Sequence, residues 1–334
     1  MEADEPIVYQ ALNIKRHREV VEELLKKSKA YYAFETPEEL EAKRKEAASR
    51  KVQYKYNRAS AELSRETIDK YLSEGKPYAV RFSIPEGRTE FEDIVHGNTV
   101  FNNSEIEDFV LMRSDGSPVF QIAVVVDDHD MKISHVIRGD DHLSNTPKQI
   151  LLYRAMGWEV PQFAHLPMLL DEQKKKLSKR RNPVAVEDYK SKGYLSEALF
   201  NFLTLLGFAP EDNREIVSKN DLIRMFTFER VNKKSAVFDM KKLDWINSEY
   251  IKSADENMIA NLVKEKLEDM KLTNESVNLQ YVKNVVSLMK ERVSTINDFT
   301  EFGKYFFEEP SKFDDKGLVK HWNPQIKPVF ADYF

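Results

Sequence analysis

The chain has 334 residues, enough for two or three domains of ordinary size. Its formal net charge of −5 argues against a protein that coats nucleic acid indiscriminately, although a local basic surface is compatible with it. The absence of cysteine excludes disulfides, thiol nucleophiles and Cys-based zinc sites. No apolar run approaches the roughly 18 residues of a membrane span, and the short acidic N-terminus differs from a signal or transit peptide. We therefore expect a cytoplasmic protein without a membrane partner.

The first 75 residues predict three helices. Apolar residues recur at near-helical spacing from Ile14 to about Lys29. Residues 36–39 (Thr-Pro-Glu-Glu) form a capping box with proline at the first helical position. Ser64 opens a further helix, which Gly75 closes. Between the last two helices, residues 50–58 are basic and interleaved with aromatic residues.

Residues 78–170 carry mainly strand patterns. Large apolar residues alternate over 78–84, and strand-like runs follow at 98–101 and 109–113. Residues 119–126 and 133–137 are apolar runs that predict buried strands of a parallel sheet. A helix at 146–156, opened by a second capping box at 146–149, and a third strand at 166–170 complete a βαβ unit. In such sheets, loops at the carboxyl ends of the strands bind ligands.

From residue 186 onward the chain is predicted to be helical. Residues 195–206 form a strongly apolar helix that Gly207 closes, and polar amphipathic helices follow to about residue 307. There is no internal repeat.

The basic run at 174–181 has two interpretations. Short basic runs are often solvated loops or nuclear-localisation-like signals. Alternatively, the run is a loop that clamps a polyphosphate, with lysines acting on the oxygens and Ser178 adding a hydrogen bond. Such charges matter most where negative charge develops on a leaving pyrophosphate.

The segment 136–142 (Val-Ile-Arg-Gly-Asp-Asp-His) favours the second interpretation. Arg138 ends a predicted buried strand, where a guanidinium is costly unless it is paired. It can grip a carboxylate ligand in a bidentate manner, or it can form an internal salt bridge with Asp140 or Asp141. The acidic and histidine residues at 127–142 could also suggest a metal cage, but none has the i,i+4 spacing of a helical metal site, so we expect no metal there.

Several ordered strings carry a family resemblance. They are residues 136–149, 165–167, 176–180 and 193–199, with further similarity at 30–32, 113–116, 238–239, 242–245 and 305–307. Together they cover nearly the whole chain. They resemble the bacterial and organellar type of glutamyl-tRNA synthetase, a class I aminoacyl-tRNA synthetase.

The resemblance implies an α/β fold. An incomplete nucleotide-binding, Rossmann-like parallel sheet would contain an inserted α+β acceptor-binding domain and be followed by all-α domains. Residues 1–14 would be the remnant of the first half of the catalytic sheet and 15–120 the inserted domain that binds the tRNA acceptor stem. Residues 121–186 would be the second half with the ATP loop. Residues 187–255 would be the helical connecting domain, and 256–334 a truncated helical anticodon-binding region.

The resemblance also implies an activity and its residues. Glutamate attacks the α-phosphorus of ATP, which acts with Mg²⁺, and the glutamyl-adenylate then acylates tRNA(Glu). The loop of Lys176, Leu177, Ser178, Lys179 and Arg180 would bind ATP, with Lys176 and Lys179 as catalytic residues. Arg138 would hold the carboxylate of L-glutamate, and Asp141 and His142 would lie beside the nucleotide. Lys51, Lys55 and Arg58 would contact tRNA phosphates, and the protein would act as a monomer.

Three departures from the family pattern qualify these expectations. The sequence lacks the His-rich nucleotide motif that follows the first strand in the family, so we expect the chain alone to be weak or inactive in adenylate formation. Phe120 stands where the family usually offers a tyrosine to the amino acid. The cysteines with which some members bind zinc are absent around Ala33, so we expect no zinc.

Two alternative functions follow. One is a non-catalytic tRNA-binding remnant or partner subunit, suggested by the missing motif and the basic stretch at 50–58. The other is a synthetase that also charges tRNA(Gln), which the sequence does not distinguish from one specific for tRNA(Glu).

Overall fold

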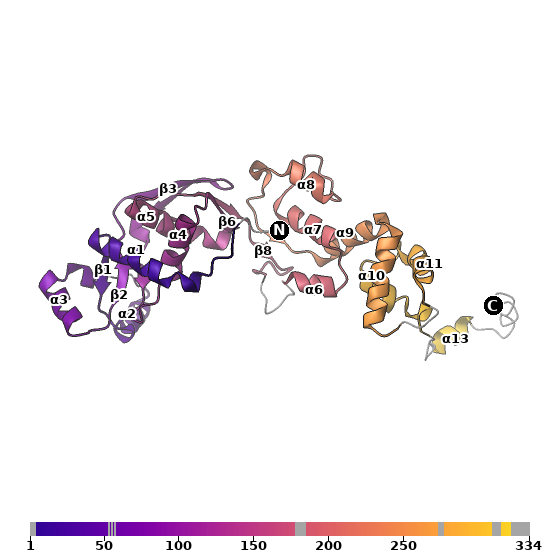
Figure 1. Cartoon of the computed structure of the whole chain (residues 1–334), viewed down its shortest axis with the longest axis horizontal. Helices are drawn as coiled ribbons and strands as arrows, with labels where there is room; N and C mark the ends of the chain where they lie inside the picture. The colour runs from indigo at the N-terminus through magenta and orange to yellow at the C-terminus, as the bar shows by residue number, and fades with distance from the viewer. Residues whose placement is uncertain are drawn as a thin grey trace. The chain divides into compact units, whose positions relative to one another are not determined.

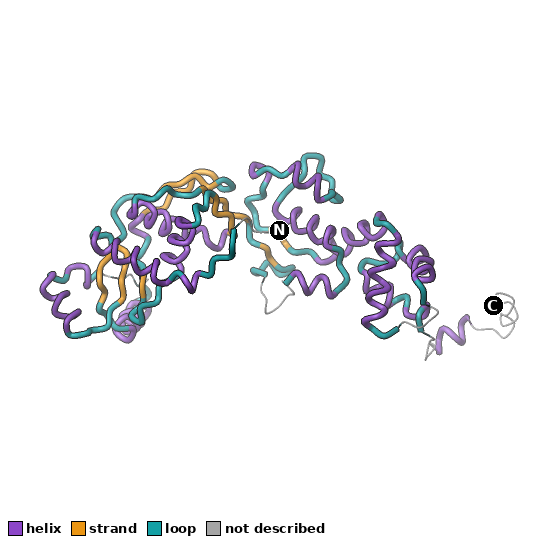
Figure 2. Tube along the Cα trace, in the orientation of Figure 1, coloured by secondary structure: helices purple, strands orange, loops and turns teal. Residues whose placement is uncertain are grey.

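The chain folds into two structural units. The computed structural model describes residues 5–52, 54, 56, 58–177, 185–272, 277–308 and 315–321. The first unit contains the residues up to Met168 together with Val231–Lys234, and the second contains the remainder. Figure 1 labels the helices and strands. Figure 2 shows that most strands belong to the first unit and that the second is mainly helical.

An antiparallel sheet with three helices forms the first part of unit 1. Its strand order is β1 (Ala30–Ala33), β2 (Ala79–Phe82), β5 (Val110–Met112), and its helices are α1 (Ile14–Lys26), α2 (Pro37–Ser49) and α3 (Arg65–Ser73). The capping box at Thr36 is confirmed, because its hydroxyl accepts from the Glu39 amide while the Glu39 carboxylate accepts from the Thr36 amide. Ser64 caps α3 in a similar way through the Thr67 amide.

A mixed four-stranded sheet forms the second part of unit 1. Its order is β4 (Gly97–Asn102), β3 (Arg88–Asp93), β7 (Gln162–Leu166), β6 (His135–Gly139), and β7 runs parallel to both of its neighbours. Helix α5 (Thr146–Met156) connects β6 to β7, so the predicted βαβ unit is confirmed. The predicted position of its second strand, 166–170, is wrong: that strand is β7, which ends at Leu166, while Leu169–Leu170 form β8 in unit 2.

The predicted strand at 119–126 is wrong: these residues begin helix α4 (Phe120–Asp130). A short, wholly apolar run does not by itself distinguish a buried strand from a buried helix. Ile122, Val125 and Val126 have the i, i+3, i+4 spacing of one helix face, and all three are buried. The run is apolar because α4 packs against both α1 and α5, rather than because it lies within a sheet.

One hydrophobic cluster packs the antiparallel sheet of unit 1 against helices α1, α4 and α5. It joins Val21 on α1, Phe82 on β2, Ile122 on α4 and Leu152 on α5, all buried. Each such side chain contributes about 1.5–3 kcal/mol through its burial. The predicted domain boundary at residue 120 falls within this cluster, and the division into five segments stays a prediction.

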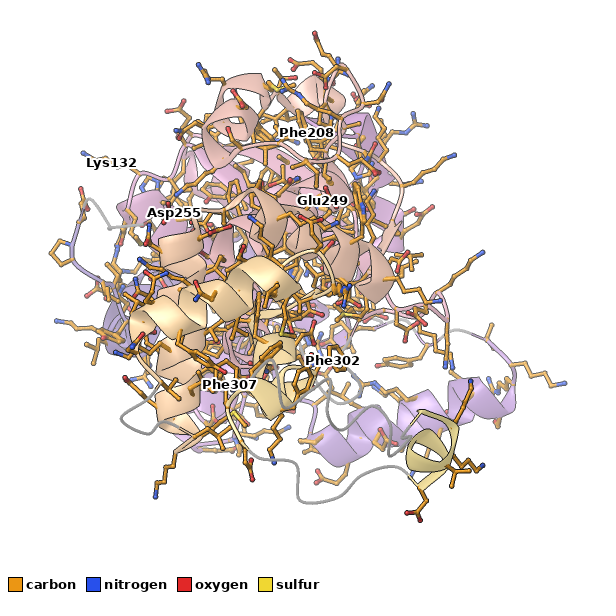
Figure 3. The ribbon with its side chains drawn as sticks, turned by 90° about the vertical axis from the view of Figure 1, so that its right-hand side faces the viewer. Lys132, Phe208, Glu249, Asp255, Phe302 and Phe307 are labelled. Atoms are coloured by element: carbon orange, nitrogen blue, oxygen red, sulfur yellow. The ribbon has the colours of Figure 1, made fainter. Side chains whose placement is uncertain are left out.

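Unit 2 is a series of helices around a short parallel strand pair, β8 with β9 (Ala236–Val237). Its helices are α6 (Val186–Ser191), α7 (Ser196–Gly207), α8 (Lys219–Met225), α9 (Met240–Ser253), α10 (Glu256–Asp269), α11 (Leu279–Met289), α12 (Ile296–Glu301) and α13 (Asp315–His321). The predicted apolar helix that ends at Gly207 is confirmed as α7. Asp255, which is labelled in Figure 3, caps α10 by accepting from the Asn257 and Met258 amides.

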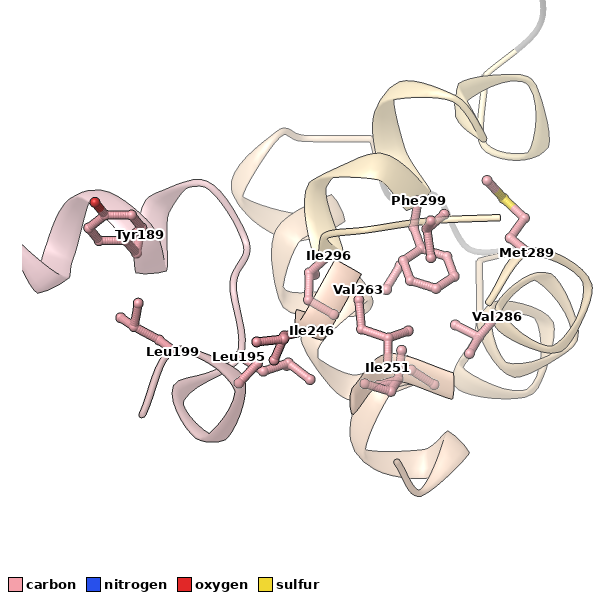
Figure 4. Close-up of a cluster of buried hydrophobic side chains, with 14 of the residues drawn as sticks. Tyr189, Leu195, Leu199, Ile246, Ile251, Val263, Val286, Met289, Ile296 and Phe299 are labelled. Atoms are coloured by element: carbon pink, nitrogen blue, oxygen red, sulfur yellow. The ribbon is translucent and has the colours of Figure 1, made fainter. Parts of the chain in front are cut away.

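The core of unit 2 runs through most of these helices. Leu195, Ile246, Val263 and Phe299 are among its buried members (Figure 4). It follows that the helices of unit 2 are held by tertiary packing as well as by their caps. Six short 3₁₀ helices complete the described chain: η1 (Gln10–Leu12), η2 (Ala59–Glu62), η3 (Asn103–Glu105), η4 (Asp140–Asn145), η5 (Phe228–Arg230) and η6 (Lys304–Phe306). No helix in the described ranges has the length and apolar character needed to cross a bilayer.

Candidate active site at the carboxyl end of the parallel strands

Three polar side chains lie at the carboxyl ends of neighbouring strands in the mixed sheet. Asp93 ends β3, His165 lies on β7, and Arg138 lies on β6, where it is the register partner of His165. Strand β7 lies between the other two, so the pleated sheet itself brings these residues together. This edge is where open α/β sheets bind ligands.

Arg138 is held by neutral acceptors. Its Nε donates to His165 Nε2 at 3.2 Å, and its Nη2 donates to Thr146 Oγ1 and Gln149 Oε1, both at 2.8 Å. The guanidinium also lies over the Phe163 ring, 5.5 Å from its centroid. Burial lowers the pKa of Arg138, while the charge of Asp128 opposes this shift.

The predicted capping box at 146–149 is therefore wrong. Asn145 precedes α5 as its N-cap residue without a side-chain cap, and Thr146 is already inside the helix. The two side chains expected to cap the helix instead bind Arg138. Hydroxyl and amide groups at a helix start can bind another nearby polar group, and here the partly buried guanidinium of Arg138 is that group.

The alternative interpretation of Arg138, a salt bridge to Asp140, does not hold for that carboxylate. Asp140 Oδ1 instead lies 2.7 Å from His96 Nε2. The hydrogen bonds of Arg138 use Nε and Nη2, so among the described residues Nη1 has no hydrogen-bond partner. A carboxylate can reach the guanidinium through the two N–H groups of Nη1.

Asp93 and His165 form a fully buried pair. His165 Nδ1 lies 2.6 Å from Asp93 Oδ2, and both side chains are 0% exposed. Asp93 Oδ1 accepts from the amides of Val95, His96 and His165. Burial opposes the charge on Asp93, but the hydrogen bonds from His165 and these amides hold its pKa below its usual value. Burial lowers the pKa of His165, so its imidazole is neutral at neutral pH.

Phe120 and His142 lie near Arg138. Phe120 is the first residue of α4, is 48% exposed, and its ring centroid lies 5.8 Å from that of His142. His142 and Asp141 belong to η4, which directly follows β6. The His142 carbonyl lies 3.5 Å from Arg138 Nη2. The structure thus brings together the predicted residues Phe120, Arg138, Asp141 and His142 at one edge of the sheet.

The basic loop belongs to unit 2, and only its beginning is described. Asp171 starts a tight turn, in which its Oδ1 accepts from the Gln173 and Lys175 amides. Lys176 then pairs with Leu170 in an antiparallel bridge, and Leu177 packs against the core of unit 2. The predicted ATP-loop residues Ser178, Lys179 and Arg180 lie outside the described residues.

The basic stretch at 50–58 is described only in part. Lys51 is exposed directly after α2 with a φ of 55°, whereas Lys55 lies outside the described residues. Arg58 Nη2 donates to the buried Asp108 carboxylate at 2.6 Å and to the Ile84 carbonyl at 2.8 Å. Arg58 therefore neutralises a buried charge, a structural role that sequence reasoning did not anticipate.

The acidic cluster at 127–142 has protein partners. Asp127 is bound by Gln10, Asn13 and His17, and Asp130 by Arg16. Within the parts of the chain that the structure describes, no three His, Asp or Glu side chains form a group that could hold a metal ion.

Comparison with known proteins gives a consistent family. Residues 1–245 match the family described as tRNA synthetases class I (E and Q), catalytic domain, and residues 241–333 match an anticodon binding domain. The chain is 42% identical over 323 residues to glutamate–tRNA ligase 1 of Caldanaerobacter subterraneus subsp. tengcongensis, covering 96% of this chain and 67% of that protein. It is 40% identical to glutamate–tRNA ligase 2 of Thermoanaerobacter pseudethanolicus, with the same coverage.

Solved structures of glutamate–tRNA ligases have a similar fold. A glutamate tRNA ligase from Elizabethkingia meningosepticum, crystallised in complex with its amino acid, superposes with a TM-score of 0.87 at 34% identity and covers 98% of this chain and 70% of that one. The chain thus spans about two thirds of the length of the relatives that it matches. Sequence, fold and domain order agree, and the chain belongs to the glutamate–tRNA ligase family of class I aminoacyl-tRNA synthetases.

Proposed function

We propose that this chain takes part in the ATP-dependent ligation of L-glutamate to tRNA(Glu), through glutamyl-adenylate, in protein synthesis. The observation that carries the proposal is the setting of Arg138, a partly buried cation with Nη1 unpaired among the described residues, at the ligand-binding edge of a class I synthetase sheet. Relatives at about 40% identity are named glutamate–tRNA ligases.

The chemistry requires a carboxylate to attack the α-phosphorus of ATP and pyrophosphate to leave. We assign the binding of a substrate carboxylate to Arg138 and place Phe120 against the amino acid. Lys176, Leu177, Ser178, Lys179 and Arg180 would bind the ATP phosphates, and Lys176 and Lys179 would stabilise the negative charge of the leaving pyrophosphate. Asp141 and His142 would lie beside the nucleotide. Mg²⁺ enters with ATP, whose phosphates it binds.

The hydrogen bonds of Arg138 bear on the expected bidentate binding of a carboxylate. Bidentate binding uses either Nε together with one terminal nitrogen, or both terminal nitrogens, Nη1 and Nη2. Here Nε donates to His165, and Nη2 donates to Thr146 and Gln149. In this arrangement the carboxylate would be bound through Nη1 alone.

The tRNA would contact the basic stretch after α2. Lys51 and Lys55 are the better candidates for phosphate contacts, since Arg58 is paired with Asp108. Residues 15–120 would contact the acceptor stem and 256–334 the anticodon region. We also propose that the protein acts as a cytoplasmic monomer without zinc.

Charging of tRNA with labelled glutamate tests the proposal. The 334-residue chain and the product of its complete gene, with any adjoining sequence, are each assayed with tRNA(Glu) and tRNA(Gln). We expect ATP-dependent charging of tRNA(Glu) by the complete product. If neither protein charges tRNA(Glu), the proposal is overturned. Charging of both tRNAs would show the broader specificity.

Binding of tRNA distinguishes the non-catalytic alternative. Lys51→Glu should weaken tRNA binding and reduce its salt dependence by about one counterion. Lys132→Glu is the matched control, because Lys132 is also an exposed lysine after a helix with a φ of 55°. Equal effects of the two substitutions would contradict a phosphate contact at Lys51. Intact tRNA binding by a complete product that does not charge would support the alternative.

A further inference from the structure

We propose that Asp93 and His165 are positioning residues that fix the guanidinium of Arg138 in one orientation, with Nη1 presented to the substrate carboxylate. This inference rests on the proposed function of Arg138. It assigns a task to two polar residues whose side chains are both 0% exposed.

The orientation begins with Asp93. Its Oδ1 accepts three backbone amides, so Oδ2 is left for His165. A carboxylate only accepts hydrogen bonds, so His165 must donate to it from Nδ1. The neutral imidazole then has an unprotonated Nε2, which is an acceptor.

The tautomer of His165 in turn orients Arg138. His165 Nε2 lies 3.2 Å from Arg138 Nε and 3.0 Å from Thr146 Oγ1. Arg138 Nε is always a donor, so it can approach Nε2 only in the tautomer that Asp93 selects. Thr146 and Gln149 bind Nη2 from the other side. Acceptors at Nε and Nη2 together fix the plane and the rotation of the guanidinium.

The cost of this arrangement indicates that it serves a purpose beyond packing. A buried carboxylate and a buried imidazole lose hydration, and well-packed apolar residues are often equally stabilising. The pair is also rigid, because backbone amides anchor one end and the sheet register fixes His165 opposite Arg138. Preorganised groups lose less freedom when the ligand binds.

Nuclear magnetic resonance of the chain labelled with ¹⁵N-histidine tests the first step directly. Seven histidines are present, and the His165 signals are those lost in His165→Gln. We expect a neutral His165 with Nδ1 protonated and Nε2 unprotonated at pH 7. A signal from the Nε2-protonated tautomer, or from an imidazolium, would overturn the proposal.

Two substitutions of His165 separate positioning from packing. The glutamine side chain can place an acceptor near the position of Nε2, whereas the asparagine side chain reaches only the position of Nδ1. We expect His165→Asn to raise the KM for glutamate about 10-fold or more, with the KM for ATP within about twofold, and His165→Gln to stay within about threefold of the wild type.

Asp93→Asn provides a third, independent readout. The side-chain oxygen of the substituted amide would still accept the backbone amides, so its N–H₂ group would face His165 Nδ1 and force the opposite tautomer. The His165 N–H would then point at the Arg138 N–H. We expect the tautomer signal to invert and the KM for glutamate to rise as in His165→Asn.

The outcomes distinguish this inference from the proposed function. If folded His165→Asn binds glutamate like the wild type, or if all three variants raise the KM values for glutamate and ATP equally, the positioning role is overturned. If the wild-type protein binds no glutamate, the proposed function fails. In that case the proposed positioning of Arg138 for glutamate fails as well. The tautomer of His165, measured by nuclear magnetic resonance, would still show whether Asp93 orients its imidazole.

Discussion

Arg138 shows how a single residue acquires a function from its neighbours. A partly buried guanidinium loses hydration, and here neutral acceptors on β7 and α5 compensate part of that loss. The remaining N–H groups of Nη1 have no hydrogen-bond partner among the described residues, as expected of a group that binds an anionic ligand.

Asp128 should make the stability of unit 1 dependent on pH. Burial raises its pKa from 3.8 to about 6, although Arg138 opposes the shift. Between about pH 4 and pH 6 the folded state keeps a proton that the unfolded state has released, so stability falls as the pH rises through this window. Asp128→Asn should therefore stabilise the protein by about 1 kcal/mol at pH 7.5, after allowance for solvent screening. This corresponds to a rise of about 2–4 °C in the thermal midpoint.

Asp130, on the same helix, is the matched control, because the shift of its pKa has the opposite direction. Its hydrogen bonds with Arg16 hold its pKa below the usual value, so its contribution is present at neutral pH and is lost as the pH falls. Asp130→Asn should lower the midpoint at pH 7.5 by a comparable or smaller amount. A lower midpoint for Asp128→Asn at pH 7.5 would contradict the assignment.

Sequence reasoning reached part of the candidate site at this scale. It placed Arg138, Asp141 and His142 at the end of one strand, and in the structure Arg138 lies on β6 while Asp141 and His142 directly follow it. It missed Asp93, because the segment that forms β3 is too polar to be predicted as a strand. In this strand Thr89, Phe91 and Asp93 lie on one face, with charged residues between them. The tautomer choice at His165 is a three-dimensional property that no sequence spacing encodes.

Among the elements, α4 and α5 show where local patterns mislead. The apolar run of α4 fitted a buried strand as well as a buried helix, and only its packing against α1 and α5 decides. At α5 the sequence has the residues of a capping box, but the side chains of Thr146 and Gln149 accept hydrogen bonds from Arg138 instead of capping the helix. Helix α2, whose start is exposed, formed its capping box at Thr36 as predicted.

The loop between α6 and α7 depends on Gly193. Its φ is +84°, and a Cβ there would lie 2.7 Å from the Asn297 amide nitrogen just inside α12. Gly193→Ala should destabilise unit 2 by about 2–4 kcal/mol, since left-handed strain and a backbone clash add together.

Gly157→Ala separates the two contributions to this cost. Gly157 also has a positive φ, of +76°, but nothing lies within 4 Å of the position of its Cβ. It should cost only about 1 kcal/mol, the backbone strain alone. Urea unfolding monitored in each unit would measure both, and equal losses would contradict a close approach at Gly193.

At the scale of the whole molecule, the chain joins a catalytic domain and an anticodon-binding domain of one family. The ordered motifs were sufficient to predict the family. The division into two units was not predicted, since the buried cluster with members between Val20 and Met156 depends on contacts between helices and strands far apart in sequence.

The assignment of Arg138 to glutamate is tested most directly by the kinetics of tRNA(Glu) charging when Arg138→Lys is made in the complete gene product. Lysine keeps the charge but loses the planar arrangement of donors. We expect the KM for glutamate to rise about 100-fold, with the KM values for ATP and tRNA within about twofold of the wild type. Arg154→Lys, an exposed arginine of the same unit whose Nη2 binds the Glu90 carbonyl, is the control and should leave all three unchanged. Wild-type kinetics for Arg138→Lys, or an equal rise in all three KM values, would contradict the assignment of Arg138 to glutamate.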